Sequence, residues 1–265
     1  MFVESAAASW QRRYGTAEPK GIDPFAPLLR HRSVRRYEDR SIEPEVMQGL
    51  MAAAQSASTS SSLQLWSAIR ISDPETRREI GLLCADQKQV HRAPEFFAFI
   101  ADHRRLQTVA NEVGEACEGL DYAEFFIMAC IDAALAAERM VCAAETLNIG
   151  CCYIGALRND VSGVQALLKL PSGTAPLFGL CLGYPRGEAA IKPRLGQSTV
   201  FFDNRYPDEP GIGDFDERMT KFYEEQQMSG ETRWSKRSGM RVDNDHLTGR
   251  EALKPWLEGQ GFWRR

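Results

Sequence analysis

Tyr122–Leu147, with the sequence YAEFFIMACIDAALAAERMVCAAETL, is the stretch that decides the fold. Its apolar residues recur at helical spacing around the whole cylinder, and few charges interrupt them. A helix that is apolar on most faces is buried, so the pattern predicts one long, buried central helix. We expect Gly150 to end it, because glycine adopts the left-handed conformation found at helix ends.

Shorter elements surround this helix. Pro44 after Ser41-Ile42-Glu43 predicts a helix through VMQGLMAAAQSA, and the residues from Ser56 to Ser62 should end it. Further helices are predicted at Pro27-Leu28-Leu29, from Asp73 to about Cys84, from Asn159-Asp160 to before Pro171, and near 214–228 and 246–260. Short apolar runs predict strands at 63–72, 94–102, 151–156 and 175–185.

Strands and helices alternate without a strict βαβ rhythm. That order favours an α+β fold with a mixed central sheet flanked by helices. Residues 1–24 show little periodicity and contain Pro19, Gly21 and Pro24, so they are interpreted as a loosely attached N-terminal arm. Residues 25–265 then form one domain that includes a C-terminal extension, with an irregular polar stretch at about 185–213.

Bulk composition excludes several classes of protein. The 265 residues carry a formal net charge of −4, which does not suggest a nucleic-acid partner. Seven cysteines without a C-x-x-C pair indicate reduced, mostly buried thiols. The N-terminus lacks an apolar signal-peptide core, and no stretch approaches the roughly 20 apolar residues of a membrane span. We therefore expect a cytoplasmic protein.

Three polar motifs could bind a ligand. The basic run His31-Arg32-Ser33-Val34-Arg35-Arg36 and the later turn Lys192-Pro193-Arg194 both suit an anion, because guanidinium groups pair with planar or tetrahedral oxygens. The run Ser58–Gln64 offers hydroxyls and backbone N–H groups. Each motif taken alone is more often a solvated surface loop than a binding site.

The sequence also lacks several well-known catalytic patterns. No G-x-G-x-x-G follows a predicted strand, and no P-loop, H-E-x-x-H or G-x-S-x-G motif occurs. The histidines show no metal-ligand spacing, so no metal site is predicted; they are His31, His91, His103 and His246.

Six segments in a fixed order carry a family resemblance. They are residues 30–35, the serine-rich loop ending at Gln64, Asp86-Gln87-Lys88, 152–159, 177–185 and Lys192-Pro193-Arg194. Together they resemble the oxygen-insensitive, NADPH-type branch of the nitroreductase superfamily, which also contains bacterial flavin reductases. The resemblance runs from about residue 25 to about residue 265.

This resemblance implies a homodimer with two FMN sites. The residues matching the family's phosphate and ribityl ligands are His31, Arg32, Ser33, Lys192 and Arg194. Arg35 would lie near the N1/O2 edge of the flavin ring, where a cation favours the reduced ring. Further contacts are implied from Ser60, Ser61, Gln64, Gln87 and Tyr153, and from the backbone N–H groups at Gly155 and Ala156 near N5.

The implied chemistry is a ping-pong transfer of hydride from NADPH or NADH to a nitroaromatic or quinone. No side chain need act as an acid or base, since solvent supplies protons. The chain departs from the family pattern at Ala156, where a second glycine is usual. It also lacks the arginine expected shortly after Phe222-Tyr223, where NADPH would be bound. Downstream cations could substitute, foremost Arg233 and Arg237, with Lys236 and Arg241 nearby.

Three other functions remain open. The chain could be an NAD(P)H:flavin reductase that supplies reduced FMN to a partner monooxygenase. It could be a non-catalytic flavin-binding or storage protein, which the missing nucleotide arginine would suit. It could also be a specialised catabolic or biosynthetic nitroreductase, with the N-terminal arm reshaping its substrate channel.

Overall fold

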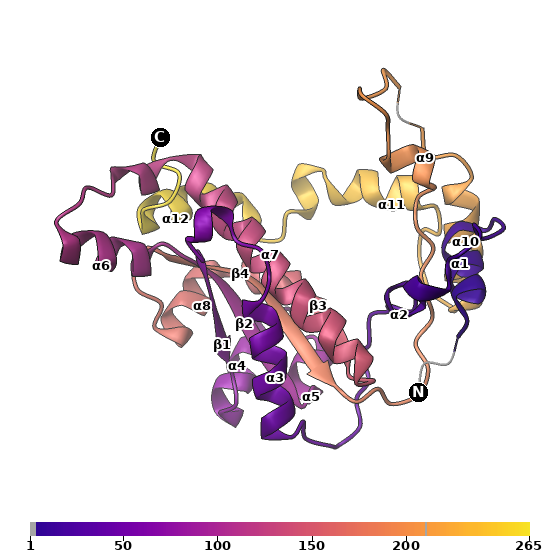
Figure 1. Cartoon of the computed structure of the whole chain (residues 1–265), viewed down its shortest axis with the longest axis horizontal. Coiled ribbons are helices and arrows are strands. Elements are labelled where there is room, and N and C mark those ends of the chain that lie inside the picture. The colour runs from indigo at the N-terminus through magenta and orange to yellow at the C-terminus, as the bar shows by residue number, and fades with distance from the viewer. Residues whose placement is uncertain (1–3, 210) are drawn as a thin grey trace. The chain divides into compact units, whose positions relative to one another are not determined.

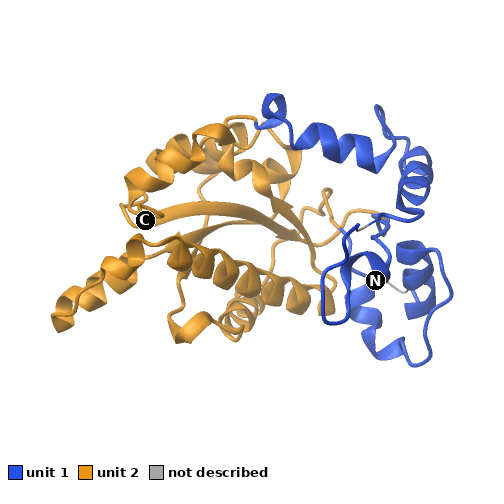
Figure 2. Ribbon diagram, turned by 90° about the horizontal axis from the view of Figure 1, so that it is seen from above, with its two compact units in different colours: residues 1–32, 189–247 blue, residues 33–188, 248–265 orange. Residues whose placement is uncertain are grey.

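The computed structural model describes residues 4–209 and 211–265, which form two compact units. Unit 1 combines the chain up to Arg32 with Ala189–Leu247, and unit 2 combines Ser33–Glu188 with Thr248–Arg265 (Figure 2). Each unit is therefore built from two separate stretches of chain. Among the described residues, no helix is long and apolar enough to cross a membrane.

Unit 2 is built on a sheet of four strands in the order β1-β2-β4-β3. The strands are β1 (Trp66–Arg70), β2 (Glu95–Asp102), β3 (Gly150–Ile154) and β4 (Thr174–Gly183). Every neighbouring pair is antiparallel, so the prediction of a mixed sheet is wrong for these strands. The parallel pairing found in this part of the chain is an isolated bridge between Ser33 and Cys151. Helices separate consecutive strands, and apolar runs alone do not indicate strand direction.

The long central helix is confirmed as α7 (Ala123–Thr146), with Tyr122 and Leu147 at its ends. It lies beside α3 (Pro44–Gln55) along one face of the sheet (Figure 1). Pro44 stands in the first turn of α3, as predicted. The core between these helices and the sheet includes Leu50, Met140, Phe97, Phe99 and Leu180.

Only one face of α7 is buried within this single chain. Its small residues, such as Ala133 and Ala137, are fully buried, whereas Ile127, Ile131 and Leu135 are exposed. These three residues recur every fourth position and form a stripe along one side of the helix. The prediction of burial on most faces is therefore wrong for this stripe.

The end of α7 also differs from the prediction. Asn148, with a φ of 58°, takes the left-handed position assigned to Gly150. Asparagine tolerates this conformation because its short polar side chain bonds locally. Gly150 instead begins β3, where a Cβ would lie 2.4 Å from Cγ2 of Val34.

Other helices complete unit 2. They are α4 (Pro74–Leu83), α5 (Lys88–Arg92), α6 (Arg104–Val113), α8 (Val161–Leu168) and α12 (Leu253–Gln260). The predicted caps are confirmed, because Asp73 accepts from the Thr76 N–H at 2.8 Å and Asp160 accepts from the Gly163 N–H. Helix α6 was not predicted. Single 3-10 turns of unit 2 occur at Ser60–Ser62, Glu118–Asp121, Gly155–Arg158 and Arg250–Ala252, and those of unit 1 at Asp23–Phe25 and Asn244–His246.

Unit 1 is helical. It contains α1 (Ala6–Tyr14), α2 (Ala26–Leu29), α9 (Gln197–Val200), α10 (Phe215–Glu225) and α11 (Trp234–Arg241). The prediction of a loosely attached arm is wrong for α1, because Trp10 and Arg13 are buried. Residues 1–3 of that arm lie outside the described residues. Helix α11 was also missed, since no helix was predicted between residues 228 and 246.

Candidate functional site

The basic run is attached to the edge strand of the unit 2 sheet. The Val34 N–H donates to the Cys151 carbonyl at 2.7 Å, and Val34 is buried. Its neighbours Ser33 and Arg35 are exposed, because successive side chains of an extended segment point to opposite sides. The missing Cβ of Gly150 leaves room for Val34. Two predicted cofactor ligands are thus presented beside β3.

Arg35 lies close enough to β3 to act on a thiol there. Burial raises the pKa of Cys152, and the Arg35 charge partly lowers it. Cys152 faces Cys181 on β4, whose Sγ donates to the Gln89 carbonyl of α5 at 3.5 Å. Gln87 directly precedes α5 without a side-chain capping hydrogen bond, and its side-chain oxygen accepts from Gln89. Arg35 and Gln87 are therefore both linked to the β3–β4 pair.

The turn after β3 is held by a residue that sequence reasoning missed. Arg250, near the C-terminus, donates to the Gly155 carbonyl at 3.1 Å and to Oδ1 of Asn159 at 3.1 Å. Ala156, which replaces the usual second glycine, is buried in this turn without a positive φ. Tyr153 precedes the turn and donates its hydroxyl to Glu138 at 3.1 Å.

The serine loop is anchored on the central helix. Asp132 of α7 is almost fully buried and accepts from the Thr59 hydroxyl at 2.5 Å, the Ser60 N–H at 2.9 Å and the Leu65 N–H at 3.1 Å. Ser61 and Gln64 have φ of 49° and 52°, which is rare for non-glycine residues. The predicted contacts Ser60, Ser61 and Gln64 thus lie on one strained loop that Asp132 holds in shape.

The remaining predicted phosphate ligands belong to unit 1. Arg32 is mostly buried; its Nε donates to the Arg30 carbonyl at 2.9 Å and its Nη1 to the Ala189 carbonyl at 3.1 Å. Its Nη2 pairs with the Glu4 carboxylate at 2.8 Å. Arg32 therefore joins the basic run to the segment that continues to Lys192.

Two cations meet on one aromatic ring in unit 1. Lys192 Nζ lies 5.8 Å from the centre of the Tyr223 ring, and Arg237 Cζ lies 4.7 Å from it. Both distances allow a cation–π attraction. Arg233 instead pairs with Glu231 at 3.4 Å at the start of α11. The downstream cation that reaches the late aromatic pair is therefore Arg237.

The predicted residues thus form separate groups. Around β3 and the turn that follows it lie Ser33, Arg35, Gln87, Tyr153, Gly155 and Ala156; the serine loop carries Ser60, Ser61 and Gln64; unit 1 carries His31, Arg32, Lys192, Arg194, Arg233 and Arg237. Of the supporting residues that were missed, Asp132 had a signal, because it is the one acid in the apolar run 125–137 of α7. Arg250 had none, since its partner Gly155 is 95 residues away.

The buried cysteines are poor nucleophiles. All seven are free thiols, and Cys84, Cys151, Cys152 and Cys181 are buried. Burial raises the pKa of Cys84 to about 12, and it also raises that of Cys151. These groups stay protonated at neutral pH, and a protonated thiol is a poor nucleophile.

Sequence profiles account for most of the chain. Residues 28–184 match the profile described as "Nitroreductase family", and residues 192–265 match "Nitroreductase family, C-terminal domain". The chain belongs to the nitroreductase family. Helix α1 precedes the part of this nitroreductase that the family profile matches.

Known relatives place it in one branch of the nitroreductase family. It is 43% identical over 180 residues to the FMN reductase (NADPH) of Bacillus subtilis, covering 68% of this chain and 72% of that one. It is 37% identical over 198 residues to the oxygen-insensitive NADPH nitroreductase of Salmonella typhimurium, covering 74% and 80%. The solved NfrA1 nitroreductase of B. subtilis superposes with a TM-score of 0.81 at 35% identity, covering 90% of this chain and 98% of that one. The branch expected from the sequence is confirmed.

Proposed function

We propose that this nitroreductase uses FMN to transfer hydride from NADPH or NADH to nitroaromatic or quinone acceptors by a ping-pong mechanism. One observation carries the proposal beyond family membership. The exposed Ser33 and Arg35 are fixed to the edge strand β3, which leads directly into the turn at Gly155. The Ser33 hydroxyl, the Arg35 guanidinium and the turn at Gly155 thereby all lie along the edge strand β3.

The chemistry of the donor set fits FMN. Lys192 and Arg194 have exposed side chains, and Arg32 lies on a neighbouring segment, which suits a phosphate. The exposed Arg35 suits a polarised carbonyl edge of the flavin ring. Bound FMN would supply a ring that accepts hydride from a nicotinamide and passes electrons to an acceptor.

The chain's own residues would bind and tune this group. Arg35 would stabilise negative charge at the N1/O2 edge of the ring, and the Ala156 N–H would donate toward N5. Arg250 would keep the turn at Gly155 in place through its hydrogen bond to that carbonyl. The serine loop would contribute Ser60, Ser61 and Gln64, with solvent delivering the protons.

NADPH is the favoured donor. The B. subtilis and S. typhimurium relatives both carry NADPH in their names. The arginine expected shortly after Phe222-Tyr223 is missing, but Arg237 of the next helix, α11, lies over the Tyr223 ring. We propose that Arg237 serves the nucleotide in place of the missing arginine.

A homodimer would cover the exposed stripe of α7. Ile127, Ile131 and Leu135 are 51%, 47% and 43% exposed, and a monomer gains nothing from leaving such a row in water. A second copy of the same chain would bury it symmetrically. Sedimentation equilibrium should give a two-chain mass for the wild type and a one-chain mass for Ile131→Glu.

Anaerobic stopped-flow reduction tests the catalytic proposal. The FMN-loaded wild type should lose its yellow colour on mixing with NADPH, and Arg35→Gln should be reduced about 100-fold more slowly, the lower end of the effect of removing one electrostatic donor. Arg36→Gln is the matched control, because Arg36 is an adjacent, exposed arginine. It should stay within about twofold of the wild type.

Two results would reject this proposal. A yellow wild type that stays oxidised with both NADPH and NADH would leave only a flavin-binding or storage role. Equal rates for Arg35→Gln and the wild type would remove Arg35 from the flavin site.

A second candidate has one observation in its favour. The B. subtilis relative, at 43% identity, is an FMN reductase. Steady-state rates with free FMN, a quinone and a nitrofuran separate the two functions. A strong preference for free FMN would favour a flavin reductase that supplies reduced FMN to a partner.

A further inference from the structure

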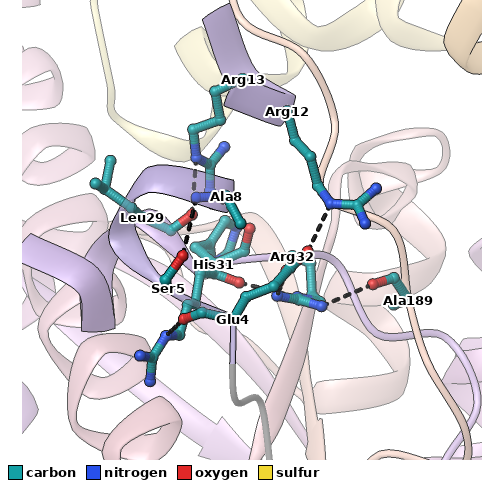
Figure 3. Close-up of polar contacts among 10 residues, drawn as sticks. Glu4, Ser5, Ala8, Arg12, Arg13, Leu29, His31, Arg32 and Ala189 are labelled. Carbon is teal, nitrogen blue, oxygen red and sulfur yellow. Dashed lines mark hydrogen bonds and ion pairs between the residues drawn. The ribbon is translucent and has the colours of Figure 1, made fainter. Parts of the chain in front are cut away.

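Helix α1 precedes the segment that the family profile matches, yet it is bonded to the basic run. Its last turn carries Arg13, which is 5% exposed. Arg13 Nε donates to the Leu29 carbonyl at 2.9 Å, and Nη2 donates to the His31 carbonyl at 2.7 Å (Figure 3). One guanidinium thus fixes the backbone immediately before Arg32.

The backbone of the same residue reaches the second phosphate segment. The Arg13 carbonyl accepts from the Arg194 N–H at 2.8 Å and from Arg218 Nη1, also at 2.8 Å. Arg218 Nη1 donates to the Arg194 carbonyl as well, at 3.0 Å. Arg13 therefore links residues 29–31 to residue 194 through two successive sets of hydrogen bonds.

The arginine side chain is well suited to this role. A guanidinium presents several donors in a rigid fork, so it can hold two carbonyls at a fixed separation. A buried charge is tolerated only when its hydrogen bonds are made. The helix that carries it is itself capped at both ends, by the Ser5 hydroxyl and by Gly15 in the left-handed conformation. The position of Arg13 is consequently well defined.

Glu4 adds a second link, just before α1. Its carboxylate accepts from Arg12 Nε at 2.5 Å and pairs with Arg32 Nη2 at 2.8 Å (Figure 3). Arg32 is also bonded to the Ala189 carbonyl. Two independent contacts from the N-terminal segment therefore converge on the residues proposed to hold the phosphate.

We propose that Arg13 is a positioning residue of this enzyme, which sets the spacing between the two cationic segments that receive the FMN phosphate. The inference rests on the proposed FMN site and goes beyond it, because α1 lies outside the family match. It predicts an effect confined to the phosphate. Riboflavin, which lacks the phosphate, should bind independently of Arg13.

Flavin titration of the full-length apoprotein tests the inference. Wild type should bind FMN at least tenfold more tightly than riboflavin. Arg13→Met should weaken FMN binding about 10- to 100-fold, the equivalent of losing one or two hydrogen bonds from a charged donor, and should leave riboflavin within about twofold. Arg205→Met, which removes an exposed arginine of the same unit, is the matched control and should change neither.

A double variant separates positioning from a general loss of structure. Arg13→Met and Arg194→Gln act on the same phosphate contact, so their combined loss of FMN affinity should be smaller than the product of the single losses. Arg13→Lys keeps the charge without the fork and should give an intermediate loss. If circular dichroism shows that Arg13→Met is unfolded, Arg13→Lys replaces it in the comparison of FMN and riboflavin affinities with the wild type.

Three results would overturn the inference. Arg13→Met could weaken FMN and riboflavin equally, which indicates a purely structural role. It could leave FMN binding unchanged. A wild type that does not bind FMN more tightly than riboflavin would reject the proposed phosphate site itself. Titration of the wild type alone would show this result.

Discussion

Replacing Asp132 by alanine should release the serine loop and destabilise unit 2. The substitution strips three donors of their common acceptor: the Thr59 hydroxyl, the Ser60 N–H and the Leu65 N–H. Leu65 is fully buried, so water cannot replace the lost bond there. A buried donor left without a partner costs about 1–3 kcal/mol.

The magnitude follows from the burial of each donor. The Leu65 N–H should carry the full cost, whereas Thr59 and Ser60 are half-buried and regain part of theirs from water. The expected fall in the free energy of unfolding is about 3–5 kcal/mol, a large share of the 5–15 kcal/mol typical of a domain. Asp132→Asn keeps one acceptor oxygen and should lose about half as much.

Chemical denaturation followed by circular dichroism measures the effect. Glu124→Ala is the control, because Glu124 is an exposed acid in the first turn of the same helix, where its loss should cost no more than about 1 kcal/mol. FMN affinity should fall together with stability in Asp132→Ala, since the loop carries Ser60 and Ser61. An Asp132→Ala variant as stable as Glu124→Ala would refute the reasoning.

Three further predictions concern charge. Glu4→Gln should tighten FMN binding about fivefold at low salt, because it removes a negative charge 2.8 Å from Arg32, worth about 1 kcal/mol; isothermal titration should show the gain fading as salt rises. Burial lowers the pKa of His103, so the folded state resists a proton that the unfolded chain accepts below about pH 6.5. The free energy of unfolding should therefore fall from pH 7.5 to pH 5, and an equal fall in His103→Gln would contradict this cause. Arg237→Ala should raise KM for NADPH severalfold more than KM for NADH; equal increases would indicate only the lost contact with Tyr223.

Much of unit 2 could be predicted because its signals are local. The spacing of the apolar residues predicted the extent of α7. Asp73 and Asp160 were recognisable as capping residues at the starts of two other helices. The apolar runs of β2 and β4 were equally clear. Strand direction was not predictable, since it depends on how helices carry the chain between strands.

The errors in the rest of the chain have a common cause. Helix α1 has only nine residues, and an isolated helix of that length is marginal in water. Its hydrogen-bond partners are the carbonyls of Leu29 and His31 and the N–H of Arg194. These partners cannot be predicted from the sequence of the helix itself. Helix α6 has no side-chain cap at His103, so the usual start signal was absent.

In the candidate site, too, local motifs could be predicted and contacts between distant parts of the sequence could not. The basic run, the serine loop and the Lys192-Pro193-Arg194 turn were visible as local motifs, and their order indicated the family. The residues that hold these motifs in shape lie far away in sequence, as for Arg250 and Gly155, 95 residues apart. Motifs can therefore be recognised from sequence, whereas their supports depend on the folded chain.

The two-segment construction of unit 1 has a consequence for biosynthesis. The hydrogen bond from Arg32 to Ala189 can form only after another 157 residues have been synthesised. The hydrogen bond between Arg13 and Arg218 can form only after another 205 residues. At about 5–20 residues per second, the synthesis of those 205 residues takes on the order of 10–40 s. Helix α1 is thus synthesised long before some of its native partners. A nascent chain that stalls before residue 189 would lack the Ala189 carbonyl that accepts from Arg32 and the Arg194 and Arg218 donors of the Arg13 carbonyl.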